Sequence, residues 1–145
     1  MSEPSHMFSG QCHCGAISME LAFTHTADEM QVRSCQCDFC TRQGSLTVSE
    51  AAGRAVISIA ADQLTTYKFG SGTASFLICS CCGVYAGVVM ADGDKLRSIA
   101  NARGLGIDAF KHRVGTQLTH DDETTPARIE RRNQRWTPTE IRYKL

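Results

Sequence analysis

A chain of 145 residues with 15 basic and 15 acidic side chains has the length of one ordinary domain and no net charge at pH 7. A domain of this size buries about two-thirds of the surface of its unfolded chain, so its eight cysteines are not required as disulfide staples. The even charge balance excludes a basic footprint for nucleic acid or for an anionic membrane. We therefore expect a single domain, residues 1–145.

The first residues, MSEPSHMFSG, lack the apolar run of a secretory signal. The longest stretch without a charged or strongly polar residue, 81–91, is far shorter than the roughly 20 residues that span a bilayer. These features predict a cytoplasmic protein, outside the membrane, with reduced thiols. In that setting clustered cysteines bind metal or perform chemistry more often than they form disulfides.

Apolar residues that recur at every second position predict a mainly β fold. After a turn at Gly15, Ile17, Met19 and Leu21 alternate with more polar or smaller residues, which is typical of a strand with one buried face. Similar stretches, separated by glycine-containing turns, lie at 55–59, 64–69, 75–79, 85–90 and 95–100. Short helices are expected in three places: a turn or two after Cys40, 49–53 and 106–113.

Four cysteines in two short pairs have the spacing of a structural zinc site. The pairs are Cys12 and Cys14 in GQCHCG, and Cys79 and Cys82 in ICSCCG. Structural zinc is held by four ligands, usually from two such pairs on separate loops. His13 is then expected to face solvent, although it is also an alternative ligand. Cys81 is left over, either as a small packed side chain at a strand end or as a thiol that exchanges into the site.

Three further cysteines lie close together in SCQCDFC: Cys35, Cys37 and Cys40. Three ligands with a vacant fourth position distinguish a catalytic zinc from a closed structural one. In the alternative, two of them form a transient disulfide and the third is an inert buried thiol. The local spacing favours metal, because it gathers three ligands at little entropic cost. Asp38 lies inside the cluster, and a backbone cap is favoured for it over a proton relay.

Four stretches of the chain resemble the glutathione-dependent formaldehyde-activating enzyme family, which also includes the domain of centromere protein V. They are GQCHCGAI, SCQCDFCTRQGS, LTTYKFGSGTASFLICSCCG and the segment 95–104. The resemblance covers residues 8–105 and leaves a C-terminal extension, 106–145. It implies an Mss4-like fold, a small antiparallel two-sheet arrangement (β-tent) shared with methionine sulfoxide reductase B. Gln36, Thr41 and Ile78 replace the family's usual His, Arg and Phe, and we expect these changes to affect the substrate rather than the metals.

Carried onto this chain, the family's motifs imply two zinc ions. The structural zinc falls on Cys12, Cys14, Cys79 and Cys82, and the catalytic zinc on Cys35, Cys37 and Cys40. The implied activity is that of a carbon–sulfur lyase, similar to S-(hydroxymethyl)glutathione synthase, which joins the glutathione thiol to formaldehyde. Glutathione also carries two carboxylates, for which Arg42, Lys68 and Arg103 are the candidate partners.

Two other functions compete with the lyase. A non-catalytic zinc module for protein or nucleic acid is disfavoured by the neutral charge. A thiol redox enzyme of the methionine sulfoxide reductase B type would hold one zinc and use a separate catalytic cysteine, so metal stoichiometry separates it from the lyase. In the C-terminal segment, Arg128, Arg131, Arg132 and Arg135 follow Asp121, Asp122 and Glu123. These mixed charges predict surface solubility or local pairing rather than a nucleic-acid stripe.

Overall fold

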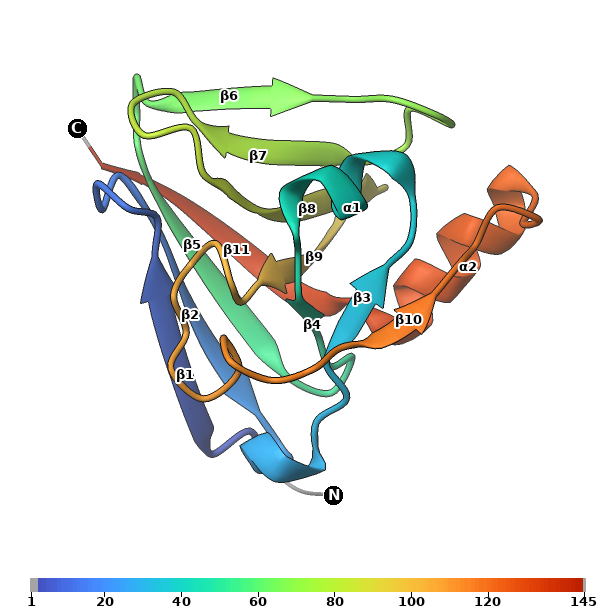
Figure 1. Cartoon of the computed structure of the whole chain (residues 1–145), viewed down its shortest axis with the longest axis horizontal. Coiled ribbons are helices and arrows are strands. Elements are labelled where there is room, and N and C mark those ends of the chain that lie inside the picture. Colours follow the sequence, from blue (N-terminus) through green and yellow to red (C-terminus); the bar gives the residue numbers. More distant parts are fainter. Residues whose placement is uncertain (1–2, 145) are drawn as a thin grey trace.

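The computed structural model describes residues 3–144 and is mainly β, as the alternating pattern predicts (Figure 1). The strands are β1 (His6–Gln11), β2 (Ile17–Phe23), β3 (Arg33–Cys35), β4 (Thr47–Val48), β5 (Arg54–Ala60), β6 (Leu64–Tyr67), β7 (Ser75–Cys79), β8 (Tyr85–Asp92), β9 (Lys95–Asn101), β10 (Thr116–Leu118) and β11 (Thr137–Lys144). The helices are α1 (Asp38–Gln43), α2 (Thr125–Arg135) and a short 3-10 turn, η1 (Ala27–Glu29). The predicted strands are present as β2 and β5 to β9, with ends close to those expected.

Strand β11 connects the two halves of a branched sheet. Its first residues, Thr137 and Pro138, pair with β9, and its remainder pairs with β5. One half runs β1-β2-β5-β11, and the other continues from β9 both through β8 to β6 and through β4 and β3 to β10. The described pairings are antiparallel except for β11 with β5 and β10 with β3, which are parallel. The last strand of the C-terminal segment therefore lies inside the sheet.

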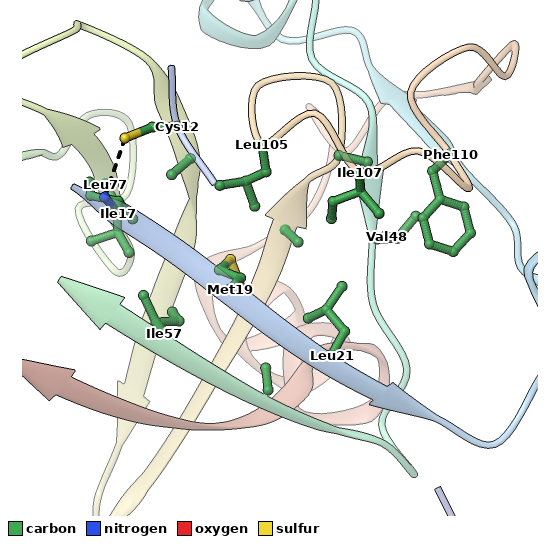
Figure 2. Close-up of a cluster of buried hydrophobic side chains, with 14 of the residues drawn as sticks. Cys12, Ile17, Met19, Leu21, Val48, Ile57, Leu77, Leu105, Ile107 and Phe110 are labelled. Atoms are coloured by element: carbon green, nitrogen blue, oxygen red, sulfur yellow. Dashed lines mark hydrogen bonds between the residues drawn. The ribbon is translucent and has the colours of Figure 1, made fainter. Parts of the chain in front are cut away.

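The inward face of β2 forms the centre of the core. Ile17, Met19 and Leu21 are all at most 1% exposed, and burial of each such side chain contributes roughly 1.5–3 kcal/mol. Figure 2 shows these side chains in one cluster with Leu105 and Phe110 from the loop after β9. The cluster fixes the start of β2, where the backbone N–H of Ile17 donates a hydrogen bond to the Sγ of Cys12 at 3.2 Å (Figure 2).

Two of the three predicted helices are wrong. Residues 49–53 form a single turn, which the hydrogen bond from Gly53 N to Glu50 O closes at 3.0 Å. Residues 106–113 form successive turns: Gly106 has a φ of 59°, outside the helical region, and the turns close with hydrogen bonds from Phe110 N to Ile107 O and from Arg113 N to Phe110 O, both 3.0 Å. The third prediction is close: α1 contains Cys40 but begins before it, at Asp38.

Helix α2 was not predicted, because it contains almost no apolar residues to show a helical period. It begins with a capping signal instead. Thr124 is the N-cap, its hydroxyl accepts a hydrogen bond from Ala127 N at 3.2 Å, and Pro126 lies in the first turn. Figure 1 shows α2 beside β10, on the side of the molecule away from the C-terminus. Among the helices of residues 3–144, none has the length and apolar character needed to cross a membrane.

Candidate active site and metal centres

The structure brings the four cysteines of the two short pairs together. Their sulfur atoms all lie within 4.8 Å of one another, with 3.8 Å between Cys12 and Cys14 and 3.5 Å between Cys14 and Cys79. Four thiolates on a tetrahedral zinc, at bond lengths of about 2.3 Å, are spaced by about 3.8 Å, whereas a disulfide joins sulfurs at about 2.05 Å. The four side chains therefore fit a closed metal site.

Tight turns on either side aim these ligands at one point. The turn after Cys79 closes with a hydrogen bond from Gly83 N to Cys79 O at 2.8 Å, and Gly83 has a φ of 79°, which favours glycine. His13 is exposed and lies outside the sulfur cluster, as expected. The packed position predicted for Cys81 is wrong, because it is exposed in the turn after β7. That turn brings the sulfurs of Cys79 and Cys82 into the cluster and leaves that of Cys81 outside it.

The other three cysteines also meet, where β3 leads into α1. Cys35 ends β3, Cys37 is the N-cap of α1, and its Sγ accepts a hydrogen bond from Cys40 N at 3.4 Å. The three sulfurs lie within 4.8 Å of one another, and within residues 3–144 no fourth Cys, His, Asp or Glu ligand joins them. Three gathered thiols suit a metal such as zinc and leave one coordination position for a substrate.

Hydrogen bonding among the three thiols gives them different pKa values. The side chains of Cys35 and Cys40 lower the pKa of Cys37 to about 2. The contact with Cys37 raises the pKa of Cys35, and the contacts with Cys35 and then Cys37 raise that of Cys40; burial adds to both increases. The cluster thus favours one thiolate, at the N-terminus of α1, supported by two thiols.

A cavity of about 270 Å³ opens beside the three-cysteine cluster. Its wall includes Cys35, Cys37 and Cys40, the aromatic residues Phe69, Phe76, Tyr85 and Trp136, and the polar residues Arg33, His120, Asp121, Arg128, Arg131 and Arg132. The four-cysteine cluster contributes none of the lining. The three-cysteine cluster therefore adjoins the cavity, and the four-cysteine cluster lies outside its wall.

Tyr85 is the most buried polar side chain of this wall that lacks a partner. It is 2% exposed, and its ring packs edge-on against Phe39, with centroids 5.2 Å apart. Its Oη is buried beside the thiol of Cys40 and makes no hydrogen bond of good geometry among the residues that the structure describes. Burial, with the nearby thiols, raises the pKa of Tyr85 well above its ordinary value, so the hydroxyl keeps its proton as a donor. Such an orphan donor marks a place where a ligand atom can bind.

His120 follows β10, which pairs with β3 so that Leu118 lies opposite Cys35. Burial, and then the charge of Arg131, lower the pKa of His120, so the imidazole is neutral at pH 7. Its Nδ1 lies 4.0 Å from Oε1 of Glu123. His120 was not predicted as a site residue. It reaches the cavity because β10 pairs with β3, and the paired residues Leu118 and Cys35 are 118 − 35 = 83 positions apart, so no local spacing shows the contact.

Helix α2 forms the basic side of the cavity. Arg128, Arg131, Arg132 and Arg135 follow the spacing i, i+3, i+4 and i+7, which places them on one helical face, and the first three line the cavity. This spacing normally carries the apolar residues that cover a core. The predicted local pairing of these charges is confirmed for Arg128 and Arg131, which both pair with Glu123. The helical spacing of the arginines was the sequence signal for a charged cavity wall, and that part was not predicted.

The predicted substrate-binding residues do not line the cavity. Arg42 pairs with Asp38 on the exposed side of α1, with 3.2 Å between Nε and Oδ2. Arg103 donates a hydrogen bond to the carbonyl of Gly44 at the C-cap of that helix, and Lys68 is exposed. Their role in substrate binding remains a prediction.

Three other expectations around α1 are corrected. The carboxylate of Asp38 neither caps the helix nor lines the cavity, because Cys37 is the N-cap and Asp38 turns outward to Arg42. Gln36 and Thr41, whose identities were expected to affect the substrate, are exposed and do not line the cavity. Gln36 folds back so that its Nε2 donates to Ser34 O at 2.9 Å.

Comparisons with known proteins agree with this geometry. A crystal structure of a Rhodobacter sphaeroides protein is similar with a TM-score of 0.58 and 26% sequence identity, and the similarity covers 76% of this chain and 99% of that chain. Fold and cysteine clusters together define a small β protein of the Mss4-like type with two potential metal sites. Residues 7–107 match the family described as glutathione-dependent formaldehyde-activating enzyme. The chain belongs to that family, as the four sequence stretches predict, and α2 and β11 lie beyond the matched segment.

Proposed function

We propose that the protein is a zinc-dependent enzyme of the carbon–sulfur lyase type, which joins a small thiol to formaldehyde or another small aldehyde in the reducing cytoplasm. Glutathione is the first candidate thiol, because the family depends on it. The observation that carries the proposal is the three-cysteine cluster, which has three ligands and opens onto a cavity.

Two zinc ions per chain fit the two sulfur clusters. Cys12, Cys14, Cys79 and Cys82 would hold the structural ion, and Cys35, Cys37 and Cys40 the catalytic one. Bound zinc would supply a position at which a thiol loses its proton readily and a Lewis acid for a carbonyl oxygen.

In the proposed reaction a carbon–sulfur bond forms and the carbonyl π bond breaks. The sulfur lone pair attacks the aldehyde carbon, the π electrons move to oxygen, and the thiol proton ends on that oxygen. The reverse, loss of the thiol from the hydroxymethyl adduct, is the lyase direction. No oxidant or reductant is needed.

Two side chains of the cavity suit the proton and the oxygen. The neutral imidazole of His120 can accept the thiol proton and return it to the product oxygen. The unpartnered Oη of Tyr85 can donate a hydrogen bond to the oxygen as negative charge develops there. Phe69, Phe76 and Trp136 supply an apolar part of the wall beside these polar groups.

The test is formaldehyde exchange measured with zinc-loaded protein. Exchange of ¹³C-formaldehyde with the glutathione adduct is followed by NMR, and zinc per chain is measured on the same sample. We expect acceleration by wild type, loss of acceleration and of one zinc in Cys37→Ala, and retention of both in Cys81→Ser, whose exposed thiol lies outside both clusters. Two bound zinc ions without acceleration for any thiol would favour a non-catalytic module. One zinc with methionine sulfoxide reduction would favour the redox enzyme.

A further inference from the structure

Arg132 reaches the cavity with part of its guanidinium unused. Its Nη1 donates to Thr73 Oγ1 at 2.7 Å, and its Cζ lies 4.9 Å from the centre of the Trp136 ring. Its Nε is buried and has no hydrogen-bond partner within the described chain. The ion pairs of residues 3–144 include no carboxylate within 4.0 Å of this guanidinium.

Arg33 enters the same cavity from β3. Its Nη2 donates to the hydroxyl of Ser49, and again no acidic side chain of the described residues pairs with it. Two half-buried arginines from different elements thus line one cavity without a counter-charge. A guanidinium is expected to be partnered when it is withdrawn from water, and its planar fork matches a carboxylate.

The other two arginines of the wall share one carboxylate. Glu123 lies 2.8 Å from Arg131 Nε and 3.5 Å from Arg128 Nε. Four arginines stand against Glu123, Asp121 and the net charge of −1 that three thiolates with one Zn²⁺ would carry, which leaves an excess of 4 − 3 = 1 positive charge around the cavity. Arg33 and Arg132 are the arginines of the wall that have no described carboxylate within 4.0 Å, and an excess of this sign attracts an anion.

We propose that Arg33 and Arg132 form a carboxylate-binding subsite, so that the protein selects thiols that carry a carboxylate. Only the identification of the ligand as a thiol rests on the proposed function. Because Arg132 lies beyond the segment 7–107 that matches the family, the α2 side of this subsite is a property of the present chain. At about 30 Å³ for each water, a cavity of about 270 Å³ has room for a small thiol acid or for one arm of glutathione.

Trp136 reports on the subsite directly. It is the only tryptophan of the chain, it is 5% exposed, and it lies in the cavity wall beneath Arg132. Its fluorescence is titrated in zinc-loaded protein with 3-mercaptopropionate and with 3-mercaptopropan-1-ol, which differ in the carboxylate alone. We expect the acid to bind at least about 10-fold more tightly, as charge-assisted hydrogen bonds predict, and the difference to shrink with added salt.

Replacement of single arginines by glutamine shows which residues cause the preference for the acid over the alcohol. In Arg132→Gln and in Arg33→Gln we expect the acid and the alcohol to bind within about twofold of each other, whereas Arg54→Gln, at an exposed strand position, keeps the wild-type preference. Thermal melting of each variant confirms folding, and either arginine variant suffices if the other does not fold. Equal binding of acid and alcohol by wild type would overturn the subsite. So would a preference that survives in both variants or disappears in Arg42→Gln instead.

S-Methylglutathione, which has both carboxylates and no thiol, separates this proposal from the lyase. Binding that Arg132→Gln abolishes supports the subsite even if formaldehyde exchange fails, and identifies a glutathione arm as the source of the carboxylate. Binding of mercaptopropionate but not of S-methylglutathione supports the subsite with a small thiol acid as its ligand. If formaldehyde exchange is equally fast with 3-mercaptopropionate and with 3-mercaptopropan-1-ol, the lyase proposal stands and the carboxylate subsite is refuted.

Discussion

Replacement of Tyr85 by Phe removes one oxygen atom and leaves the rest of the cavity wall in place. The edge-on contact with Phe39 at 5.2 Å does not involve the hydroxyl, so a phenylalanine ring keeps it. A buried hydroxyl without a partner costs about 1–3 kcal/mol. We expect Tyr85→Phe to raise the free energy of unfolding by about 1 kcal/mol, which corresponds to a melting temperature about 3 °C higher for a domain of this size.

Activity should change in the opposite direction. If Tyr85 Oη donates to the developing oxygen, its loss lowers kcat by about 100-fold, as loss of one oxyanion donor does elsewhere. Calorimetric melting and the formaldehyde-exchange rate are measured on the same zinc-loaded preparation. A variant that melts below wild type would show that the hydroxyl is satisfied in the folded protein. A more stable variant with unchanged kcat would remove Tyr85 from the chemistry.

Three further changes test other parts of the structure. Cys82→Ser should lose one zinc and melt at lower temperature, because a four-thiolate zinc contributes to folding free energy; full metal content with unchanged melting would contradict the structural site. His120→Gln should keep both zinc ions and lower the exchange rate by about 100-fold at pH 7, and a wild-type rate would remove it as the base. The hydrogen bond to Glu50 raises the pKa of His25, so this stabilisation is complete below about pH 6.5 and is lost as pH rises through the folded-state pKa. The melting difference between wild type and His25→Gln should therefore shrink as pH rises above about 6.5, whereas a constant difference would refute the charge pair.

Strands with a buried face could be predicted because their signal is local. The alternation of Ile17, Met19 and Leu21 identifies β2 from consecutive residues, and turns with glycine mark the neighbouring strands. Strand β11 has no such pattern: it contains Pro138 and is mostly polar, and its position depends on the pairing of Thr139–Lys144 with β5. Helix α2 likewise has no apolar pattern from which it could be predicted, because the residues that recur at helical spacing are arginines.

Sequence by itself determined the three-cysteine cluster and the two pairs of the four-cysteine cluster, because each depends on short spacings such as C-x-C and C-x-x-C that place neighbouring thiols together. The two pairs meet only in the folded chain, where Cys14 contacts Cys79 across 65 residues of sequence. Only the tertiary structure decided which other side chains face the two clusters. Arg42 is close to Cys40 along the chain, but the helical turn directs it to Asp38 and solvent. Arg132 is distant along the chain, yet the pairing of β10 with β3 and of β11 with β9 brings α2 against the cavity. Strand register and the packing of a polar helix depend on contacts across the whole fold, and no window of the sequence contains them.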